Sequence, residues 1–211
     1  MDNTMLLSFL VLIISYILGS IPIGLIVGKV SRGIDIRQFG SGNIGATNVL
    51  RTLGIVPATV VFIGDTLKGL GAVLIARSLL SDYPMVIVLA GLAAIAGHSA
   101  SVFLGFKGGK GVATSLGVII GITPLVACTA FGLWVIIVAV TRYVSIASII
   151  ASISAPVMMW FSQKLFGRPT PIEYTIFAAA AAVLILIRHK SNISRLISGT
   201  EPRIGHHVQL K

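Results

Sequence analysis

The chain has 211 residues, of which 55% are hydrophobic and only 10% are charged, and its mean hydropathy is +1.00. A soluble domain of this length carries about a quarter charged residues, so the composition excludes an ordinary soluble fold and indicates an integral membrane protein. The formal net charge of +10 fits either nucleic-acid binding or a basic cytoplasmic face that meets anionic lipids and substrates. Apolar stretches long enough to span a membrane, roughly 20 residues each, favour the basic cytoplasmic face and predict no nucleic-acid partner.

The first half of the chain contains three apolar stretches. Residues 6–27 predict a span rather than a signal peptide, because no Lys or Arg precedes them. The second stretch, residues 56–80, contains Asp65 and Lys68, which are three residues apart and therefore share a helical face. The two side chains either neutralise each other or serve the site, where Asp65 would orient a basic group. The third span is predicted over residues 85–104.

Residues 112–140 fit either one span or two. At about 1.5 Å per residue they overshoot a hydrocarbon core of roughly 30 Å if they form one straight helix. Residues 121–124 end in Pro124, which removes a backbone donor and favours a helix break there. The alternatives are one kinked span, which makes six in all, or two shorter spans, which make seven.

The distribution of basic residues decides between six and seven spans. With seven spans and the N-terminus outside, 12 Lys and Arg residues lie in the cytoplasm and 3 outside, whereas six spans divide them 8 to 7. The three outside residues are Arg77, Lys164 and Arg168. The positive-inside rule favours seven all-α spans, with 144–161 as the sixth, 172–187 as the seventh and a cytoplasmic tail from Arg188 to Lys211.

The first polar segment, residues 40–54, reads GSGNIGATNVLRTLG. Its hydroxyl and amide side chains are Ser41, Asn43, Thr47 and Asn48, all able to bind alcohol or phosphate oxygens. Arg51 offers a bidentate fork for phosphate, and Gly45 allows close approach of the backbone. The alternative is an ordinary Gly/Ser/Asn loop that caps neighbouring helices.

The second polar segment, residues 105–115, reads GFKGGKGVATS. Its glycines let successive backbone N–H groups converge on an anion, Lys107 and Lys110 add charge, and a helix is predicted to begin near Thr114. It is not a P-loop of the GxxxxGK[ST] type, because Leu104 replaces the first glycine and Gly111 the magnesium-binding hydroxyl. The alternative is a tight turn whose lysines reach lipid headgroups.

Two later groups are predicted to lie at the same membrane face. Arg142 precedes Ser145 and Ser148 on one helical stripe, although such serines often only permit close helix packing. The tail begins with a basic flank that contains His189 and Asn192. His98, near the inner end of the third span, has no cluster of Cys, His or carboxylates around it in the sequence, so no metal site is predicted.

Taken together, these motifs resemble the bacterial acyl-phosphate:glycerol-3-phosphate acyltransferases, membrane enzymes of phospholipid synthesis. The resemblance covers nearly the whole chain and rests on residues 40–54, on residues 97–98 with 106–114, and on residues 142–148. One departure is Ala100-Ser101, where the family has an aromatic-proline pair. That departure concerns the local shape at the end of the third span.

The resemblance implies a single transmembrane domain, residues 1–211, in the bacterial inner membrane with its active site on the cytoplasmic face. It implies transfer of a fatty acyl group from acyl-phosphate to the 1-hydroxyl of glycerol 3-phosphate, with membrane lipids around it and no cofactor or obligatory protein partner. The expected catalytic residues are Ser41, Asn48, Arg51, Lys110 and Ser148. The expected substrate-binding residues are Asn43, Gly45, Thr47, His98, Lys107, Gly108, Gly109, Gly111, Thr114, Arg142, Ser145, His189 and Asn192.

The expected mechanism is positioning and charge stabilisation, because the three segments contain no carboxylate and the donor is already activated. Lys110 and the N–H groups of residues 108–111 would hold the acyl-phosphate, whose departing phosphate takes the hydroxyl proton. Two other classes of protein would use the same basic groups: an organic-phosphate transporter and a structural protein with a lipid-binding face. A transporter commonly shows inverted repeats and a site near the bilayer midplane, and the sequence has no such repeat.

Overall fold

The computed structural model describes residues 3–167 and 170–205. Within these ranges the chain forms α-helices and short 3-10 turns, with no β-strand, as the hydropathy pattern predicts. The predicted positions of Arg168 and Lys211 lie outside the described residues. The elements are α1 (Asn3–Ser20), α2 (Ile23–Arg32), η1 (Ile36–Gln38), α3 (Ala46–Leu53), α4 (Ile55–Leu79), α5 (Pro84–Ser99), η2 (Val102–Leu104), α6 (Val112–Ile122), α7 (Pro124–Thr141), α8 (Val144–Trp160), α9 (Ser162–Phe166), α10 (Ile172–Arg188) and α11 (Lys190–Ile197).

The predicted break in residues 112–140 is confirmed. The helix α6 ends at Ile122 and α7 begins at Pro124, with Thr123 between them. Two helix ends differ from the predicted stretches. Residues 6–27 lie within the candidate span Asn3–Arg32, but they form two helices, because α1 ends at Ser20 and Pro22 stands directly before α2, where it removes a helical donor. The third stretch stops being α-helical at Ser99, and Val102–Leu104 forms a 3-10 turn.

Several of the described helices are long and apolar enough to cross a membrane. By length and composition, three segments can cross one: Asn3–Arg32, Ile55–Leu79 and Pro124–Thr141. The pair α10 and α11, bent by 58°, makes a fourth if it is counted as one span. The apolar helices Pro84–Ser99, Val112–Ile122 and Val144–Trp160 are shorter. Many large apolar side chains on the outer surface are exposed, as expected where lipid replaces water.

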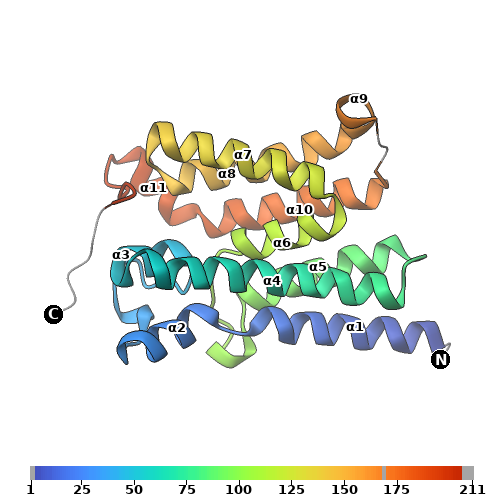
Figure 1. Cartoon of the computed structure of the whole chain (residues 1–211), viewed down its shortest axis with the longest axis horizontal. Coiled ribbons are helices and arrows are strands. Elements are labelled where there is room, and N and C mark those ends of the chain that lie inside the picture. Colours follow the sequence, from blue (N-terminus) through green and yellow to red (C-terminus); the bar gives the residue numbers. More distant parts are fainter. Residues whose placement is uncertain (1–2, 168–169, 206–211) are drawn as a thin grey trace.

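The long helices lie side by side along the longest dimension of the molecule (Figure 1). Helix α4 packs against α6 and α1 against α5, while α8 packs against both α7 and α10. The short elements α2, η1, α3 and α11 gather at one end, which we call the polar end; the N-terminus, α9 and the α4–α5 turn lie at the other (Figure 1). The packing therefore brings segments from the whole length of the chain to one end.

Glycines permit the closest helix contacts. A Cβ on Gly117 of α6 would overlap the Thr66 carbonyl oxygen of α4, and one on Gly69 of α4 would overlap the Thr114 carbonyl oxygen of α6. The backbones of α4 and α6 therefore touch, as small residues allow in membrane helices. This contact places the start of α6, and with it the 105–111 loop, directly beside α4.

Candidate active site

A cavity opens at the polar end and continues between the helices. Its polar wall contains residues from all the segments singled out in the sequence: Ser41, Asn43, Gly45, Thr47, Asn48, Arg51, Asp65, His98, Lys110, Gly111, Ser115, Ser145, Ser148, Ser152, His189, Asn192 and Glu201. Its apolar wall is formed by α4, α6, α7, α8 and α10 and includes Phe62, Leu116, Ile119, Phe131, Trp134, Ala155, Ala178 and Ile185. The cavity thus joins a basic, hydroxyl-rich end to a long apolar arm.

Five expected site residues do not line this cavity. Lys107 is exposed on the loop, and Gly108 and Gly109 pack against the end of α5. Thr114 is fully buried at the α4–α6 contact. Arg142 is exposed and lines a second cleft with Thr47, Arg51 and residues 204–205. These residues surround the main cavity without forming its wall.

In the first segment, Asn48 organises the loop that leads into α3. Its side chain is 2% exposed. Its Oδ1 accepts from the Ser41 N–H at 2.8 Å, and its Nδ2 donates to the carbonyl oxygens of Ile36, Phe39 and Asn43 at 3.2, 3.1 and 2.8 Å. The Asn48 amide, which the sequence assigns to catalysis, therefore already makes its hydrogen bonds to backbone groups of the protein. Asn48 holds Ser41 and Asn43 in place at the cavity wall.

Arg51 of α3 is the buried cation of this segment. It is 8% exposed, and its Nη2 donates to the Pro202 carbonyl oxygen at 3.0 Å. Burial lowers the pKa of its guanidinium, an effect that Glu201 opposes. Within the described residues its Nε–H has no hydrogen-bond partner. A buried guanidinium with a donor left over is suited to receive an anionic ligand.

The loop of residues 105–111, which we call the glycine-lysine loop, turns at three residues with positive φ. Gly105, Phe106 and Gly111 have φ values of 61°, 60° and 83°. The Gly109 N–H donates to the His98 carbonyl oxygen at 3.0 Å, so this member of the predicted N–H cradle is used within the protein. A Cβ on Gly109 would overlap the His98 ring, which means that the loop closes tightly on that side chain.

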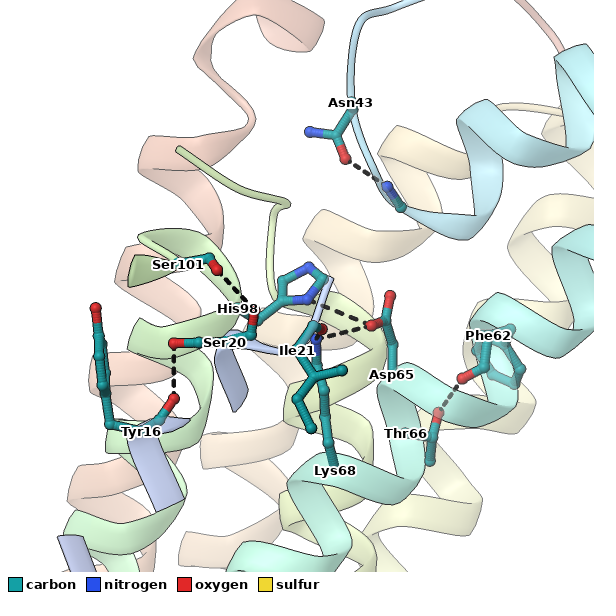
Figure 2. Close-up of polar contacts among 11 residues, drawn as sticks. Tyr16, Ser20, Ile21, Asn43, Phe62, Asp65, Thr66, Lys68, His98 and Ser101 are labelled. Carbon is teal, nitrogen blue, oxygen red and sulfur yellow. Dashed lines mark hydrogen bonds and ion pairs between the residues drawn. The ribbon is translucent and has the colours of Figure 1, made fainter. Parts of the chain in front are cut away.

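Asp65 lies between two basic side chains in the interior (Figure 2). Its Oδ1 is 2.9 Å from Lys68 Nζ and 3.5 Å from His98 Nδ1, and all three side chains are buried. Lys68 Nζ also donates to the Ile21 carbonyl oxygen at 3.0 Å, at the break between α1 and α2. The ion pair agrees with the first interpretation, in which Asp65 and Lys68 neutralise each other, and Asp65 also approaches the ring that supports the glycine-lysine loop.

The Ala100-Ser101 departure is accommodated by contacts between α1 and the end of α5. The Ser101 hydroxyl donates to the Ser20 carbonyl oxygen at 2.6 Å, and the Tyr16 hydroxyl donates to the Ala100 carbonyl oxygen at 2.8 Å. Gly97 packs directly on the backbone of α1 at Tyr16. These contacts anchor the turn that precedes the loop.

Lys110 points into the cavity towards the start of α11. Its Nζ donates to Asn192 Oδ1. Burial lowers the pKa of Lys110 to about 8; Glu201 opposes this shift, while Arg195 and Arg51 add to it. Lys110 is therefore mostly charged at neutral pH, in a site where a partly desolvated ammonium attracts anions strongly.

His189 follows the last residue of α10 and is 3% exposed. Its Nδ1 is 2.8 Å from the Ile185 carbonyl oxygen. Burial, with the nearby Lys110 charge, lowers its pKa to about 4, so the imidazole is neutral at pH 7. Because a carbonyl oxygen only accepts hydrogen bonds, Nδ1 carries the hydrogen in this neutral ring and donates to Ile185.

The two serines of α8 that the sequence assigns to the site, Ser145 and Ser148, have different surroundings. Ser148 Oγ donates to the Val144 carbonyl oxygen at 2.8 Å and accepts from Trp134 Nε1 at 3.2 Å. Ser145 is buried beside Glu201. Ser148, which the sequence assigns to catalysis, therefore orients Trp134, whose ring stacks on Phe131 in the apolar arm.

Sequence reasoning missed Glu201, which it left in the tail. The carboxylate is 6% exposed and lines the cavity. It accepts from Asn192 Nδ2 at 2.6 Å and from Arg195 Nε at 2.8 Å. The only sequence signal is a single acidic residue within a basic tail, and its burial depends on the tail folding back over the polar end.

Comparisons with known proteins agree with this geometry. The family described as Glycerol-3-phosphate acyltransferase matches residues 9–199. A glycerol-3-phosphate acyltransferase of Synechococcus sp. (strain JA-2-3B'a(2-13)) is 48% identical over 95% of this chain and 96% of its own length. One of Moorella thermoacetica, glycerol-3-phosphate acyltransferase 2, is 45% identical over 93% and 97%.

Two solved structures share the fold. Crystal structures of PlsY (YgiH), an integral membrane glycerol 3-phosphate acyltransferase, in its glycerol 3-phosphate form and its lysophosphatidic acid form have TM-scores of 0.87 and 0.85. Each is 42% identical and covers 94% of this chain and 96% of its own. With a match along almost its full length, this chain belongs to the glycerol-3-phosphate acyltransferase family.

Proposed function

We propose that this protein transfers a fatty acyl group from acyl-phosphate to the 1-hydroxyl of glycerol 3-phosphate, which yields 1-acylglycerol 3-phosphate and phosphate. The observation that carries this assignment is the shape of the cavity, which joins two cations, the buried Arg51 and the half-buried Lys110, to an apolar arm. Both substrates carry a phosphoryl group, and one also carries an acyl chain. The glycerol 3-phosphate and lysophosphatidic acid forms of the related structures correspond to acceptor and product.

Lys110 is assigned to the acyl-phosphate and Arg51 to glycerol 3-phosphate. The assignment of Lys110 is supported by its position directly before the N-terminus of α6, where the helix dipole and the first N–H groups favour an anion. Arg51 is supported by its buried Nε–H, which has no hydrogen-bond partner in the part of the chain that the structure describes, and by the hydroxyls of Ser41 and Thr47 in the wall of the same cavity. The acyl chain would follow the apolar arm between α6, α8 and α10.

The proposed reaction needs no protein nucleophile. The C1 hydroxyl oxygen attacks the acyl carbonyl carbon, an ester C–O bond forms, and the bond from that carbon to the phosphate oxygen breaks. The phosphate leaves with the electron pair and accepts the hydroxyl proton. The cations and N–H groups act by holding the two substrates in register and by stabilising negative charge as it develops.

We propose seven spans, with the N-terminus outside, and a cytoplasmic polar end in the bacterial inner membrane. The break at Thr123 supports the count, because it divides residues 112–140 into two helices that run in opposite directions (Figure 1). The gathering of the basic segments at one end supports the orientation. The same arrangement disfavours a transporter, whose site is expected near the bilayer midplane.

The test is a direct assay on purified protein with a synthetic acyl-phosphate and labelled glycerol 3-phosphate. We expect lysophosphatidate and phosphate to appear in equal amounts, and Lys110→Ala to suppress both. Uptake or exchange of glycerol 3-phosphate by reconstituted vesicles without any product would instead identify a transporter. Lipid binding without product or exchange would leave a structural role.

A further inference from the structure

The chain after α11 folds back across the polar end and touches both proposed phosphate sites. Glu201 accepts from Asn192 and Arg195, and the next residue, Pro202, accepts through its carbonyl oxygen from Arg51 at 3.0 Å. The Ile204 N–H donates to the Arg142 carbonyl oxygen at 2.8 Å, which ties this segment to the α7–α8 connection.

The chemistry of Glu201 determines the orientation of the Asn192 amide. An ionised carboxylate only accepts hydrogen bonds, so the NH₂ group of Asn192 must face Glu201. The amide oxygen is then turned away from Glu201 and towards Lys110, whose ammonium only donates. A neutral group able to donate at position 201 would allow the amide to rotate and present its NH₂ group to the ammonium.

We propose that Glu201 is a positioning residue for acyl transfer: through the Asn192 amide it holds Lys110 where the acyl-phosphate binds, while the adjacent Pro202 carbonyl holds Arg51. This inference rests on the proposed function. One two-residue segment would then set the separation between the donor and acceptor phosphates. Such preorganisation matters because a displacement of about 1 Å can reduce a rate on the order of 10²-fold.

The charges around Lys110 support a second effect of Glu201. Arg51 and Arg195 repel the ammonium, His189 is neutral, and Asp65, which lines the same cavity, is paired with Lys68. Glu201 is the carboxylate that raises the pKa of Lys110 against burial, while its own pKa is lowered: burial acts to raise it, but hydrogen bonding to Asn192 and Arg195 outweighs burial. Removing its charge should therefore let Lys110 lose its proton at lower pH.

The test compares Glu201→Gln with Glu173→Gln, a control at the opposite end of the molecule, in the full-length protein. We measure the thermal midpoint, kcat, KM for acyl-phosphate, and kcat/KM against pH. Glu201→Gln should lower kcat on the order of 10²-fold and move the alkaline limb of the profile to lower pH. Glu201→Asp keeps the charge and should keep the limb at its wild-type position. Glu173→Gln should match the wild type.

Three results would overturn the proposal. A lower kcat of Glu201→Gln with an unmoved alkaline limb would make Glu201 a structural residue only. An alkaline limb that is displaced equally in Glu201→Asp would show that the limb does not report the charge of this carboxylate. A lower KM with unchanged kcat would mean that the carboxylate competes with substrate phosphate. If Glu201→Gln does not fold, Glu201→Asp decides: a wild-type kcat contradicts positioning, a reduced kcat at a wild-type thermal midpoint supports it, and a reduced kcat with a lowered thermal midpoint makes Glu201 a structural residue only. Wild-type protein without product would refute the proposed function itself.

Discussion

At the scale of single residues, the two lysines of the second polar segment have different surroundings. Lys107 is exposed on the loop, whereas Lys110 is half-buried and contacts Asn192 across the cavity. Electrostatic stabilisation is stronger where water is excluded, so the same charge does more at position 110. The sequence places both in one loop and does not distinguish them.

The first prediction concerns Lys110. We expect Lys110→Ala to lower kcat/KM for acyl-phosphate about 10²- to 10³-fold, the usual loss when one charge-stabilising group is removed. The matched control is Lys164→Ala, an exposed lysine on α9 at the other end of the molecule. Steady-state kinetics on both purified variants makes the comparison. Similar losses in both would contradict the assignment of the donor site.

The second prediction concerns the general base. The candidates that the sequence offers near the polar segments are Asp35, Asp65, His98 and His189. The hydrogen bond from Arg37, which outweighs desolvation, lowers the pKa of Asp35 to about 2, so this carboxylate is a weak base. Asp65 is paired with Lys68, and the pKa of His189 is about 4.

A protein base loses activity as pH falls through its pKa, so removing it should abolish the acidic limb and cost about 10²- to 10⁴-fold in rate. If the leaving phosphate accepts the proton, Asp35→Asn, Asp65→Asn, His98→Ala and His189→Ala should each retain that limb. Asp65→Asn leaves Lys68 without its counter-charge and should lower stability. The measurement is kcat against pH, with folding checked by thermal midpoint. A folded variant without activity or pH dependence would identify the base.

At the scale of elements, the helix interruptions position the site. Pro22 separates α2 from α1, and the Ile21 carbonyl oxygen beside it accepts from Lys68 Nζ as well as from the Ile23 N–H. Pro124 starts α7 after the break that ends α6. Because a proline nitrogen donates no hydrogen bond, each break leaves backbone groups to be satisfied elsewhere. The first break connects the polar end to the buried Asp65 group.

The third prediction concerns the α4–α6 contact. Gly117→Ala would force a Cβ into the Thr66 carbonyl oxygen, so we expect a loss of about 1–3 kcal/mol in stability, the usual cost of overpacking. The matched control is Gly132→Ala on α7, where the added Cβ meets no described atom within 4 Å other than the backbone of its own helix and its chain neighbours. Thermal unfolding in detergent measures both. If the two variants melt together, the close backbone contact is not a source of stability.

At the scale of the whole molecule, the number of spans decides on which side of the membrane the tail lies. Only an odd number of spans puts the tail and the N-terminus on opposite sides. The polar end collects α2, α3 and α11, and the loop before α6 lies nearer the middle of the molecule (Figure 1). If that end is cytoplasmic, Arg142 at the α7–α8 connection is cytoplasmic as well. Ser81, in the α4–α5 turn, is then outside.

The fourth prediction tests this orientation. Cys128 is exposed and is first replaced by alanine, so that only an introduced thiol reacts. In this background, Thr141→Cys beside Arg142 should be labelled from the cytoplasm alone, and Ser81→Cys should be labelled from outside by a membrane-impermeant reagent. Labelling of Thr141→Cys from outside would restore six spans.

The sequence by itself predicted the features that depend on local composition. Apolar runs predicted the helices, Pro124 predicted the break before α7, and the motifs around Arg51 and Lys110 identified the family. Hydropathy, proline and glycine act over a few neighbouring residues, so a linear pattern records them. Helix ends were less accurate, as at Ser99, because contacts with α1 decide where α5 stops.

Only the tertiary structure decided how each polar group of the site is used. Asn48 and Ser148 satisfy other protein groups, Arg51 retains a donor, and Glu201 enters the cavity from the tail. Arg51 and Pro202 are 151 positions apart, and Lys110 and Asn192 are 82 apart. A hydrogen bond depends on distance and direction in space, and these are set by helix packing across the whole chain rather than by the residues beside each partner.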